Sequence, residues 1–266
     1  MGKKNKIVVF SWIAFFSIVV LVWSGCMLWG YYSDYRKEKT LEDEFSQMRE
    51  DAKQEVVSAE AGATVGGAEP SEDLKKERTQ EEMLAFYQKM KEQNTDYVCW
   101  LTLKGSEIDY PVMQRDNSFY LNHDYKAEKN RHGSIFMDEN CDPDGPLVLI
   151  HGHHMKDGTM FGGLKQYKDE EWRRTHREVV LELSDGQRKY RIFAAALVDL
   201  TVEDSFAFEK IPDTQEQRNT YIEGLLDVCF WMDDDVNTEE ASVLVLSTCE
   251  YGSDDERLLV AAVRTE

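Results

Sequence analysis

The sequence from about residue 98 onward carries a succession of short apolar runs, each bounded by Gly, Pro, Asp or Ser. Such runs are typical of buried β-strands. Many short strands with few helices favour a closed sheet, because closure leaves no edge strand unpaired. We therefore expect a mainly β protein with a closed or nearly closed barrel of about eight strands. The expected strands are Val98–Leu103, Tyr110–Met113, Ser134–Met137, Leu147–Ile150, Val179–Leu183, Tyr190–Leu200, Val243–Leu246 and Leu258–Val263.

Two amphipathic stretches indicate helices. Residues Thr79–Glu82 have the pattern of a capping box, which predicts a helix over about Gln80–Gln93. Apolar residues at helical spacing predict a longer helix over Thr214–Met232, before the last two strands. Asp185-Gly186 lies between two expected strands and predicts a hairpin turn.

An uncharged run of 23 residues, Ile7–Trp29, lies near the N-terminus. At about 1.5 Å per residue, a helix of this length crosses a hydrocarbon core of about 30 Å. We expect residues 1–6 to form a cytoplasmic tail and residues 7–30 a transmembrane signal anchor. The N-terminus is expected inside, because a long domain after a short tail is usually translocated. A cleaved signal peptide or lipidation at Cys26 is the alternative.

Two polar segments separate this run from the expected globular domain. Residues 31–57 are highly charged, with apolar residues at helical spacing, which predicts a membrane-proximal helix. Residues 58–78 begin with a Gly-rich stretch of small side chains that cannot bury a core, so they predict a flexible linker. The globular domain is expected over residues 79–266.

Composition excludes several function classes. The chain has 266 residues and a net charge of −20, which disfavours nucleic-acid binding because that needs a basic surface. Its five cysteines are odd in number, irregularly spaced and without a CxxC motif, which argues against a disulfide framework or a Cys-rich zinc site. The neighbouring His151, His153 and His154 lack an HExxH-type partner carboxylate. We expect no metal and no cofactor.

The last two expected strands bring a thiol beside a cation. Cys249 closes the first strand and Arg257 opens the second, with seven residues between them. In an antiparallel pair the two residues face each other, with Cβ atoms about 4.5–5.5 Å apart. A nearby cation favours the nucleophilic thiolate and stabilises the oxyanion that forms when the thiolate attacks a carbonyl.

A proton donor is expected from a third element. Gly152 breaks the strand Leu147–Ile150, and His153 then lies where a strand enters a loop, a common position for functional residues. A Cys, a His and an Arg far apart in sequence form a constellation suited to acyl transfer. His154 is the alternative histidine, and Arg264, at the far end of its strand, is the alternative arginine.

With these motifs in this order, residues from about Thr79 to Val263 resemble the sortases, and more narrowly the class B sortases. The resemblance implies an eight-stranded sortase barrel with an N-terminal helix and a long helix before the last strands. His151 departs from the pattern, since many class B members carry a Tyr at this position. The matching residues are Leu246-Ser-Thr-Cys249 with Arg257, Ile150–Phe161, Ile108–Val112, Asp116-Asn117, Tyr120-Leu121 and Gly133–Asp138.

The resemblance implies a membrane-anchored cysteine transpeptidase on the surface of a Gram-positive cell. Such an enzyme cleaves the C-terminal sorting signal of a secreted protein after Thr. It then transfers the protein to an amine of a peptidoglycan precursor or of a pilin. The resemblance implies Cys249 as nucleophile, His153 as general acid and then base, and Arg257 as oxyanion donor.

Three residues beside Cys249 are candidates for binding or orienting the substrate: Ser247, Thr248 and Glu250, the last through its backbone N–H. Two alternative functions stay open. One is a thiol hydrolase that releases the protein to water. The other is a non-enzymatic, membrane-tethered pilus-assembly module.

Overall fold

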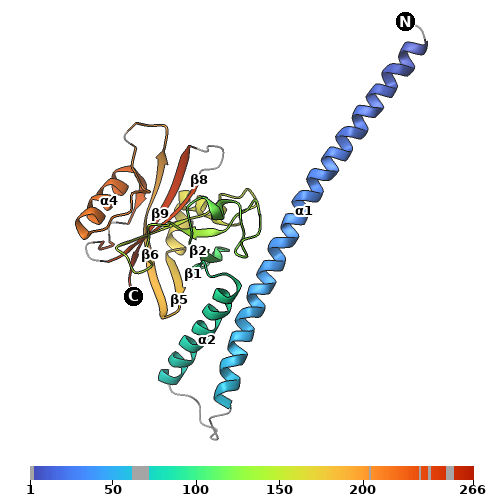
Figure 1. The fold of residues 1–266 in the computed structure, drawn as a ribbon. Coiled ribbons are helices and arrows are strands. Elements are labelled where there is room, and N and C mark those ends of the chain that lie inside the picture. The colour runs from blue at the N-terminus through green and yellow to red at the C-terminus, as the bar shows by residue number, and fades with distance from the viewer. Residues whose placement is uncertain (1–2, 62–71, 204, 234, 239–240, 250–254) are drawn as a thin grey trace. The chain divides into compact units, whose positions relative to one another are not determined.

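A computed structural model of the chain describes residues 3–61, 72–203, 205–233, 235–238, 241–249 and 255–266. The chain forms two compact units, Met1–Val57 and Ser58–Glu266. The first unit lies in helix α1, Lys3–Ala61, which is drawn in blue in Figure 1. At 1.5 Å per residue its 59 residues extend over about 90 Å.

Helix α1 contains both the uncharged run and the charged segment that follows it, without a break between them. Within the described part of the chain, no helix meets the length and apolarity that crossing a membrane requires. The transmembrane anchor and the domain boundaries therefore stay predictions from the sequence.

The expected linker, residues 58–78, overlaps helix at both ends, and residues 62–71 lie outside the described residues. Helix α2 spans Glu72–Gln93, so it begins earlier than the expected Gln80. Thr79 is therefore an interior residue of α2 and not its N-cap, because the charged residues before it continue the helix.

The second unit is built on one sheet, which has nine strands among the described residues, in the order β5-β1-β2-β3-β4-β8-β9-β6-β7 (Figure 1). Strand β6 also pairs with β5, which closes the first eight strands into a barrel. This confirms the expected mainly β, eight-stranded barrel. The strands are β1 Tyr97–Leu103, β2 Asp109–Met113, β3 Ile135–Met137, β4 Leu147–His151, β5 Glu178–Leu183, β6 Gly186–Asp199, β7 Cys229–Met232, β8 Val243–Cys249 and β9 Glu256–Arg264.

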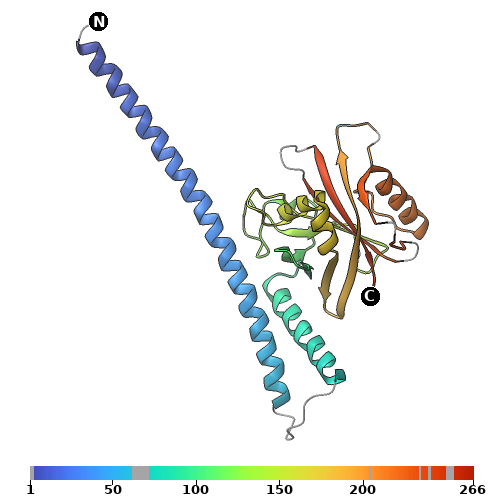
Figure 2. The same cartoon turned by 180° about the vertical axis from the view of Figure 1, so that it is seen from behind.

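Strands β4, β8 and β9 bury almost every described side chain instead of alternating between buried and exposed. One face of these strands contributes to the barrel core. The other face of β8 and β9 is covered by the 3-10 helix η2, Phe161–Lys168, which lies with α3, Glu170–Thr175, in front of the strands in Figure 2. Burial on both faces explains why these strands read as continuous apolar runs.

The helix expected over Thr214–Met232 is wrong in its last four residues. Helix α4 spans Gln215–Val228, with Thr214 as its N-cap, and Cys229–Met232 forms β7. The four residues of β7 are Cys, Phe, Trp and Met, and the aromatic ones favour strands. They pair with residues 194–196 of β6 and alternate in exposure as in a strand. Tertiary pairing therefore overrides the helical spacing that the sequence displays here.

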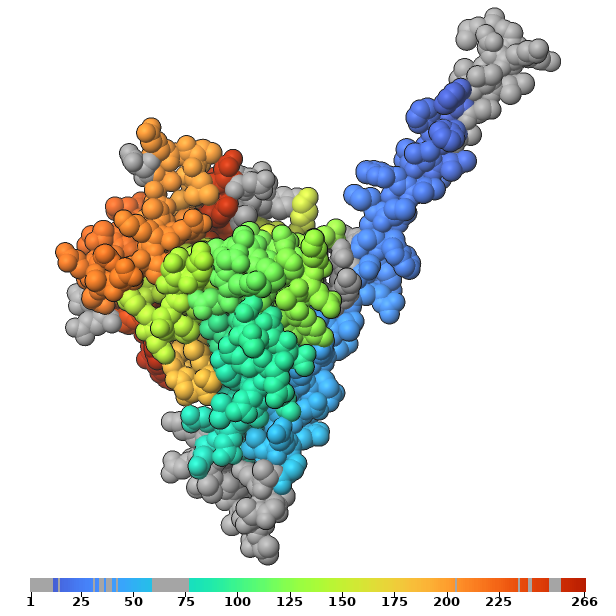
Figure 3. All heavy atoms as spheres, viewed as in Figure 1, coloured from blue at the N-terminus to red at the C-terminus, as the bar shows by residue number. Residues whose placement is uncertain are grey.

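The hairpin expected at Asp185-Gly186 is confirmed, because Leu183 pairs with Gly186 at the start of the β5–β6 ladder. Gly186 has a φ of 141°, which favours glycine. The short 3-10 helix η1, Phe119–Leu121, interrupts the long connection from β2 to β3. Figure 3 shows the side chains of this connection and of α2 covering the near side of the barrel.

Parallel pairing brings the ends of distant segments together. Strands β4 and β8 are parallel and in register from Leu147↔Val243 to His151↔Ser247, so their C-terminal ends reach the same edge of the barrel. Strand β9 returns antiparallel to β8 and starts at that edge. This arrangement brings the candidate catalytic residues to one edge of the barrel. Cys249 ends β8, Arg257 lies at the start of β9, and His153 follows the end of β4.

Candidate active site

A cavity of about 230 Å³ lies at this edge of the barrel. Residues from the β2–β3 connection, β3, the ends of β4 and β8, the start of β9 and the β6–α4 connection line it. A concave site that collects polar groups from several elements is the usual form of a binding or catalytic site. The lining residues are Asn117, Leu121, Phe136, His151, Gly152, His153, Glu209, Ser247, Thr248 and Arg257.

Cys249 and Arg257 are direct partners in the β8–β9 ladder. Cys249 is the last residue of β8, and Thr248, immediately before it, lines the cavity. Arg257 lines the same cavity and is half-buried, and its Nη1 donates to the Glu256 carbonyl oxygen at 3.3 Å. The antiparallel pairing expected from the sequence is therefore present. Glu250 lies outside the described residues.

His153 is positioned by backbone contacts on both sides. The N–H of Gly152 donates to the Ser247 carbonyl oxygen at 3.1 Å, which continues the β4–β8 pairing, and the N–H of Phe161 donates to the His153 carbonyl oxygen at 3.0 Å. A Cβ at Gly152 would lie 2.4 Å from Ile135 Cδ1 and 2.7 Å from the buried Phe161 ring. Only glycine lets the chain turn here without displacing these side chains.

The far end of the same loop is also restrained. Met160 has a φ of 52° and a ψ of −126°, a positive-φ conformation that costs free energy for a residue with a side chain. The hydroxyl of Tyr110 accepts a hydrogen bond from the Met160 N–H at 3.1 Å, and Met160 is also bridged to His154. The loop that carries His153 is therefore held at both ends.

One ring nitrogen of His153 already has a partner. Its Nε2 lies 2.6 Å from the carbonyl oxygen of Leu121 in η1. A carbonyl oxygen only accepts, so Nε2 carries the hydrogen and donates it. This fixes the orientation of the imidazole and leaves Nδ1 for proton exchange in the cavity.

Ser247 and Thr248 are both buried and line the cavity. The buried Thr248 Oγ1 has no hydrogen-bond partner among the described residues. A buried hydroxyl without a partner costs free energy, which is recovered if a bound molecule supplies the partner. The structure therefore brings these two candidates into the site.

The alternative residues lie elsewhere. His154 does not line the cavity and forms an isolated bridge with Met160. Arg264 ends β9 opposite Tyr190, seven residues from Arg257, and donates to Asp144 at 3.4 Å. Seven residues of extended strand span about 23 Å, so Arg264 is remote from Cys249.

Three other cysteines are poor nucleophiles. Burial raises the pKa of Cys99 and raises the pKa of Cys141 to about 12. Burial also raises the pKa of Cys229, which is half-buried. The thiolate is the reactive form, so these thiols are largely unreactive near pH 7.

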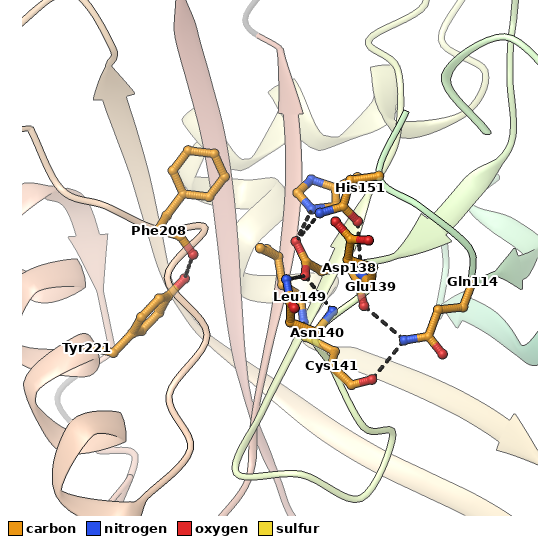
Figure 4. A network of polar contacts seen from close by, with 10 residues as sticks. Gln114, Asp138, Glu139, Asn140, Cys141, Leu149, His151, Phe208 and Tyr221 are labelled. Atoms are coloured by element: carbon orange, nitrogen blue, oxygen red, sulfur yellow. Dashed lines mark hydrogen bonds and ion pairs between the residues drawn. The ribbon is translucent and has the colours of Figure 1, made fainter. Parts of the chain in front are cut away.

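A second histidine, His151, lines the cavity, although its sequence pattern indicated no role there. The Nε2 of His151 lies 3.4 Å from Oδ2 of the buried Asp138, and Asn117 donates to the same oxygen at 2.8 Å. Figure 4 shows this network, in which Gln114 also bridges the carbonyl oxygens of Asp138 and Cys141. Asn117 and Asp138 belong to the matching motifs, but only the fold reveals that they meet.

Comparisons with known proteins place this geometry in context. The sequence model of the sortase domain family matches residues 101–265. A sortase B of Listeria monocytogenes is 33% identical over 170 residues, which cover 62% of this chain and 67% of that protein. A sortase B of Staphylococcus aureus is 30% identical over 200 residues, covering 69% of this chain and 76% of that protein.

Solved structures agree with the sequence matches. The crystal structure of a mutant form of Clostridium perfringens sortase B has a TM-score of 0.63 at 26% identity. That alignment covers 70% of this chain and 90% of the other. The Staphylococcus aureus sortase B–substrate complex has a TM-score of 0.61 at 25% identity, with 68% and 85% covered.

Proposed function

The chain belongs to the sortase family, and from this premise we propose that Cys249, His153 and Arg257 catalyse a class B-type cysteine transpeptidation in the cavity at the barrel edge. The activity itself is that of a cysteine transpeptidase, as in the related sortases B. One observation carries the assignment of residues. The strand partner of Cys249 is Arg257, and Arg257 and His153 line one cavity.

In the first half of the reaction, the Cys249 thiolate attacks the carbonyl carbon of Thr in a C-terminal sorting signal. The carbonyl electron pair moves to oxygen, and Arg257 donates hydrogen bonds to this oxyanion. When the oxyanion collapses, the C–N bond to the next residue breaks. The His153 imidazolium gives its Nδ1 proton to the leaving amine, while Nε2 stays bound to the Leu121 carbonyl oxygen.

In the second half, an amine attacks the Cys249 thioester. His153, now neutral, accepts the proton of this amine at Nδ1, and Arg257 again stabilises the oxyanion. The C–S bond breaks and the thiolate is restored, so the cycle closes with no net change in the enzyme. The amine belongs to a peptidoglycan precursor or to a pilin. The backbone N–H of Glu250 and the hydroxyls of Ser247 and Thr248 bind or orient the substrate.

The enzyme acts on the outer face of a Gram-positive membrane, held by a signal anchor in residues 7–30. The 23-residue uncharged run supports this part of the proposal. So does the exposure of large apolar side chains along α1, including Trp12, Leu21 and Trp29. The secreted proteins that it anchors are its first substrates.

A peptide-library cleavage screen with the full chain tests the function. The library contains variants of Asn-Pro-x-Thr-Asn and Pro-x-Thr-Gly, the two kinds of signal that class B relatives use. We expect cleavage after Thr and, when triglycine is added as the amine acceptor, a product in which Thr is joined to triglycine by an amide bond. Product that forms equally fast without any amine indicates a hydrolase, and absence of cleavage and of acyl-enzyme indicates a non-enzymatic module.

Cys249→Ala tests the nucleophile. The variant is expected to form no acyl-enzyme. Intact-protein mass spectrometry after incubation with a peptide that the screen shows to be cleaved measures this. A thiol-to-methyl change at a strand end is small, so the fold should persist. Cys229→Ala is the matched control and should keep the activity. If activity were lost in Cys229→Ala and kept in Cys249→Ala, the nucleophile would be Cys229 and not Cys249.

A further inference from the structure

His151 gives the cavity a second imidazole, in addition to His153. It ends β4 directly beside Ser247 of β8, and Ser247 lies two residues before Cys249. Its ring stacks on Phe136, with 5.1 Å between centroids, and its side chain is 15% exposed. His151 therefore lies on the cavity wall beside the end of β8, with its ring packed against Phe136.

Asp138 determines which ring nitrogen faces the cavity. Its Oδ1 accepts from the N–H and the side-chain amide of Asn140 at 2.9 and 3.1 Å. Its Oδ2 accepts from Asn117 at 2.8 Å and lies 3.4 Å from His151 Nε2. Burial alone would raise the pKa of Asp138, but the hydrogen bonds from His151, Asn140 and Asn117 outweigh it and hold the pKa below its usual value.

An ionised carboxylate only accepts hydrogen bonds, so His151 Nε2 carries a hydrogen and donates it to Asp138. The other nitrogen, Nδ1, lies on the opposite edge of the ring, away from Asp138 (Figure 4). It makes no hydrogen bond within the described part of the chain and is not sealed from solvent. Protonation of the ring turns Nδ1 from an acceptor into a donor.

We propose that the His151 imidazolium, paired with Asp138, donates its Nδ1–H to a backbone carbonyl of the bound sorting-signal peptide. His151 is then a pH-dependent specificity residue, because the neutral ring presents a lone pair that repels the same carbonyl. This inference rests on the proposed transpeptidase function and adds a contact to its peptide site.

The charges around His151 are consistent with this role. Asp138, after β3, is the anion in direct contact, and Glu209, from the β6–α4 connection, is a second anion on the cavity wall. Arg257 is a cation on the wall, His153 is a second titratable group there, and Cys249 follows Thr248 on β8. Asp138 therefore compensates the charge of the imidazolium locally, while the peptide contact uses the other edge of the ring.

The ionisation is tested without any peptide. Full-chain protein carrying Cys249→Ala is labelled with ¹³C at histidine Cε1 and titrated by NMR from pH 5 to pH 8.5. The signal absent in His151→Phe assigns the residue among the six histidines. We expect Asp138→Asn to move the midpoint of the His151 signal to lower pH, because it removes the carboxylate that pairs with the imidazolium. A His151 signal that does not change between pH 5 and pH 8.5, or whose midpoint Asp138→Asn leaves unchanged, overturns the proposal.

The contact is tested by the binding of a fluorescein-labelled Asn-Pro-Gln-Thr-Asn peptide to the same Cys249→Ala chain. A hydrogen bond from a charged donor predicts affinity about tenfold higher at pH 5 than at pH 8.5. His151→Phe keeps the stacked ring, and it should bind about tenfold more weakly at low pH and lose this pH step. His176→Phe removes a histidine that stacks on Trp172 outside the cavity, and it should behave as the parent.

The two proposals fail in different ways. Suppose that the wild-type chain turns over the peptide, but His151→Phe shows the same pH dependence of affinity as its Cys249→Ala parent. This outcome overturns the inference about His151 alone. Absence of both binding and turnover in the wild-type chain overturns the proposed function and this inference with it. An Asp138→Asn chain that binds with the midpoint of its pH step moved to lower pH supports the proposal.

Discussion

Arg257 can stabilise an oxyanion both through its positive charge and through the fixed directions of its hydrogen-bond donors. It is half-buried, it lines the cavity, and it is the ladder partner of Cys249. A planar guanidinium offers several donors in fixed directions, whereas an ammonium is a point charge on a flexible stem. If Arg257 binds the oxyanion, its contribution is larger in the transition state than in the ground state.

Arg257→Lys is therefore expected to lower kcat by about 10²–10³, the usual cost of removing one oxyanion donor. Arg257→Ala should lose at least as much, and KM for a fluorogenic sorting-signal peptide should change far less. Steady-state kinetics with triglycine as acceptor measures both. Arg264→Ala is the control and should be nearly silent. A kcat near that of the wild type in Arg257→Lys would show that charge alone suffices.

Asp138 links the site to the stability of the fold. Asp138→Asn replaces a carboxylate that accepts four hydrogen bonds, so we expect the free energy of unfolding at pH 7 to fall by about 1–3 kcal/mol. The pKa of Asp138 is lowered in the folded state, so this stability is present above the unfolded pKa of about 3.9 and is lost as pH falls through the folded pKa.

The measurement is urea unfolding of the two proteins at pH 7, 5 and 3.5. The difference between wild type and Asp138→Asn should shrink towards the lowest pH. Exposed Asp142 provides the matched control, and Asp142→Asn should change stability by less than about 0.5 kcal/mol at every pH. A deficit of Asp138→Asn that is constant with pH would mean that the charge of Asp138 contributes no stability.

At the scale of elements, strands were more predictable than helix boundaries. Each of the eight expected apolar runs forms a strand with ends within a few residues, and the signal is strongest in β4, β8 and β9, which are buried on both faces. The β7 strand was missed, since Val228 and Trp231 continue the helical spacing of α4. Its pairing with residues 194–196 of β6 is a contact between distant segments, which local patterns do not contain.

Helix α4 offers a test of local capping. The Thr214 side chain accepts from the Gln217 N–H at 3.2 Å and satisfies one of the free donors at the helix start. Thr214→Ala should lower the free energy of unfolding by about 1 kcal/mol, measured by urea denaturation. Thr220→Ala, an exposed interior position of the same helix, should be neutral or slightly stabilising because Ala is the better helix former. Equal losses in both variants would contradict a capping role for Thr214.

At the scale of the whole molecule, the sequence predicted the class of fold but not what joins its parts. Cys249 and Arg257 are close in sequence, so a hairpin was enough to bring them together. His153 reaches them through the parallel β4–β8 ladder, and Asp138 reaches His151 through β3 and β4. These pairings span long stretches of chain, so the residues alone indicated a catalytic set and not its surroundings.

The N-terminal segment requires an experiment on the complete chain. An uncharged apolar run of this length is unfavourable in water, because each large apolar side chain that is exposed to water costs free energy. In a membrane, by contrast, a single Arg at the helix centre costs about 2.5–3.5 kcal/mol on the insertion scale. Charge placed at the middle of the run should therefore oppose insertion, whereas the same charge placed beyond the run should not.

We expect the full chain, expressed in a Gram-positive host, to stay in the membrane fraction after an alkaline wash and to be shaved by external protease. Val20→Arg combined with Leu21→Arg should shift the chain towards the soluble fraction, because the two substitutions together cost about 5–7 kcal/mol at the helix centre. Gln47→Arg with Gln54→Arg adds the same charge outside the run and should leave the chain in the membrane. A mature N-terminus near Cys26 would indicate a processed leader, and protection from protease in intact cells would reverse the orientation that we predict.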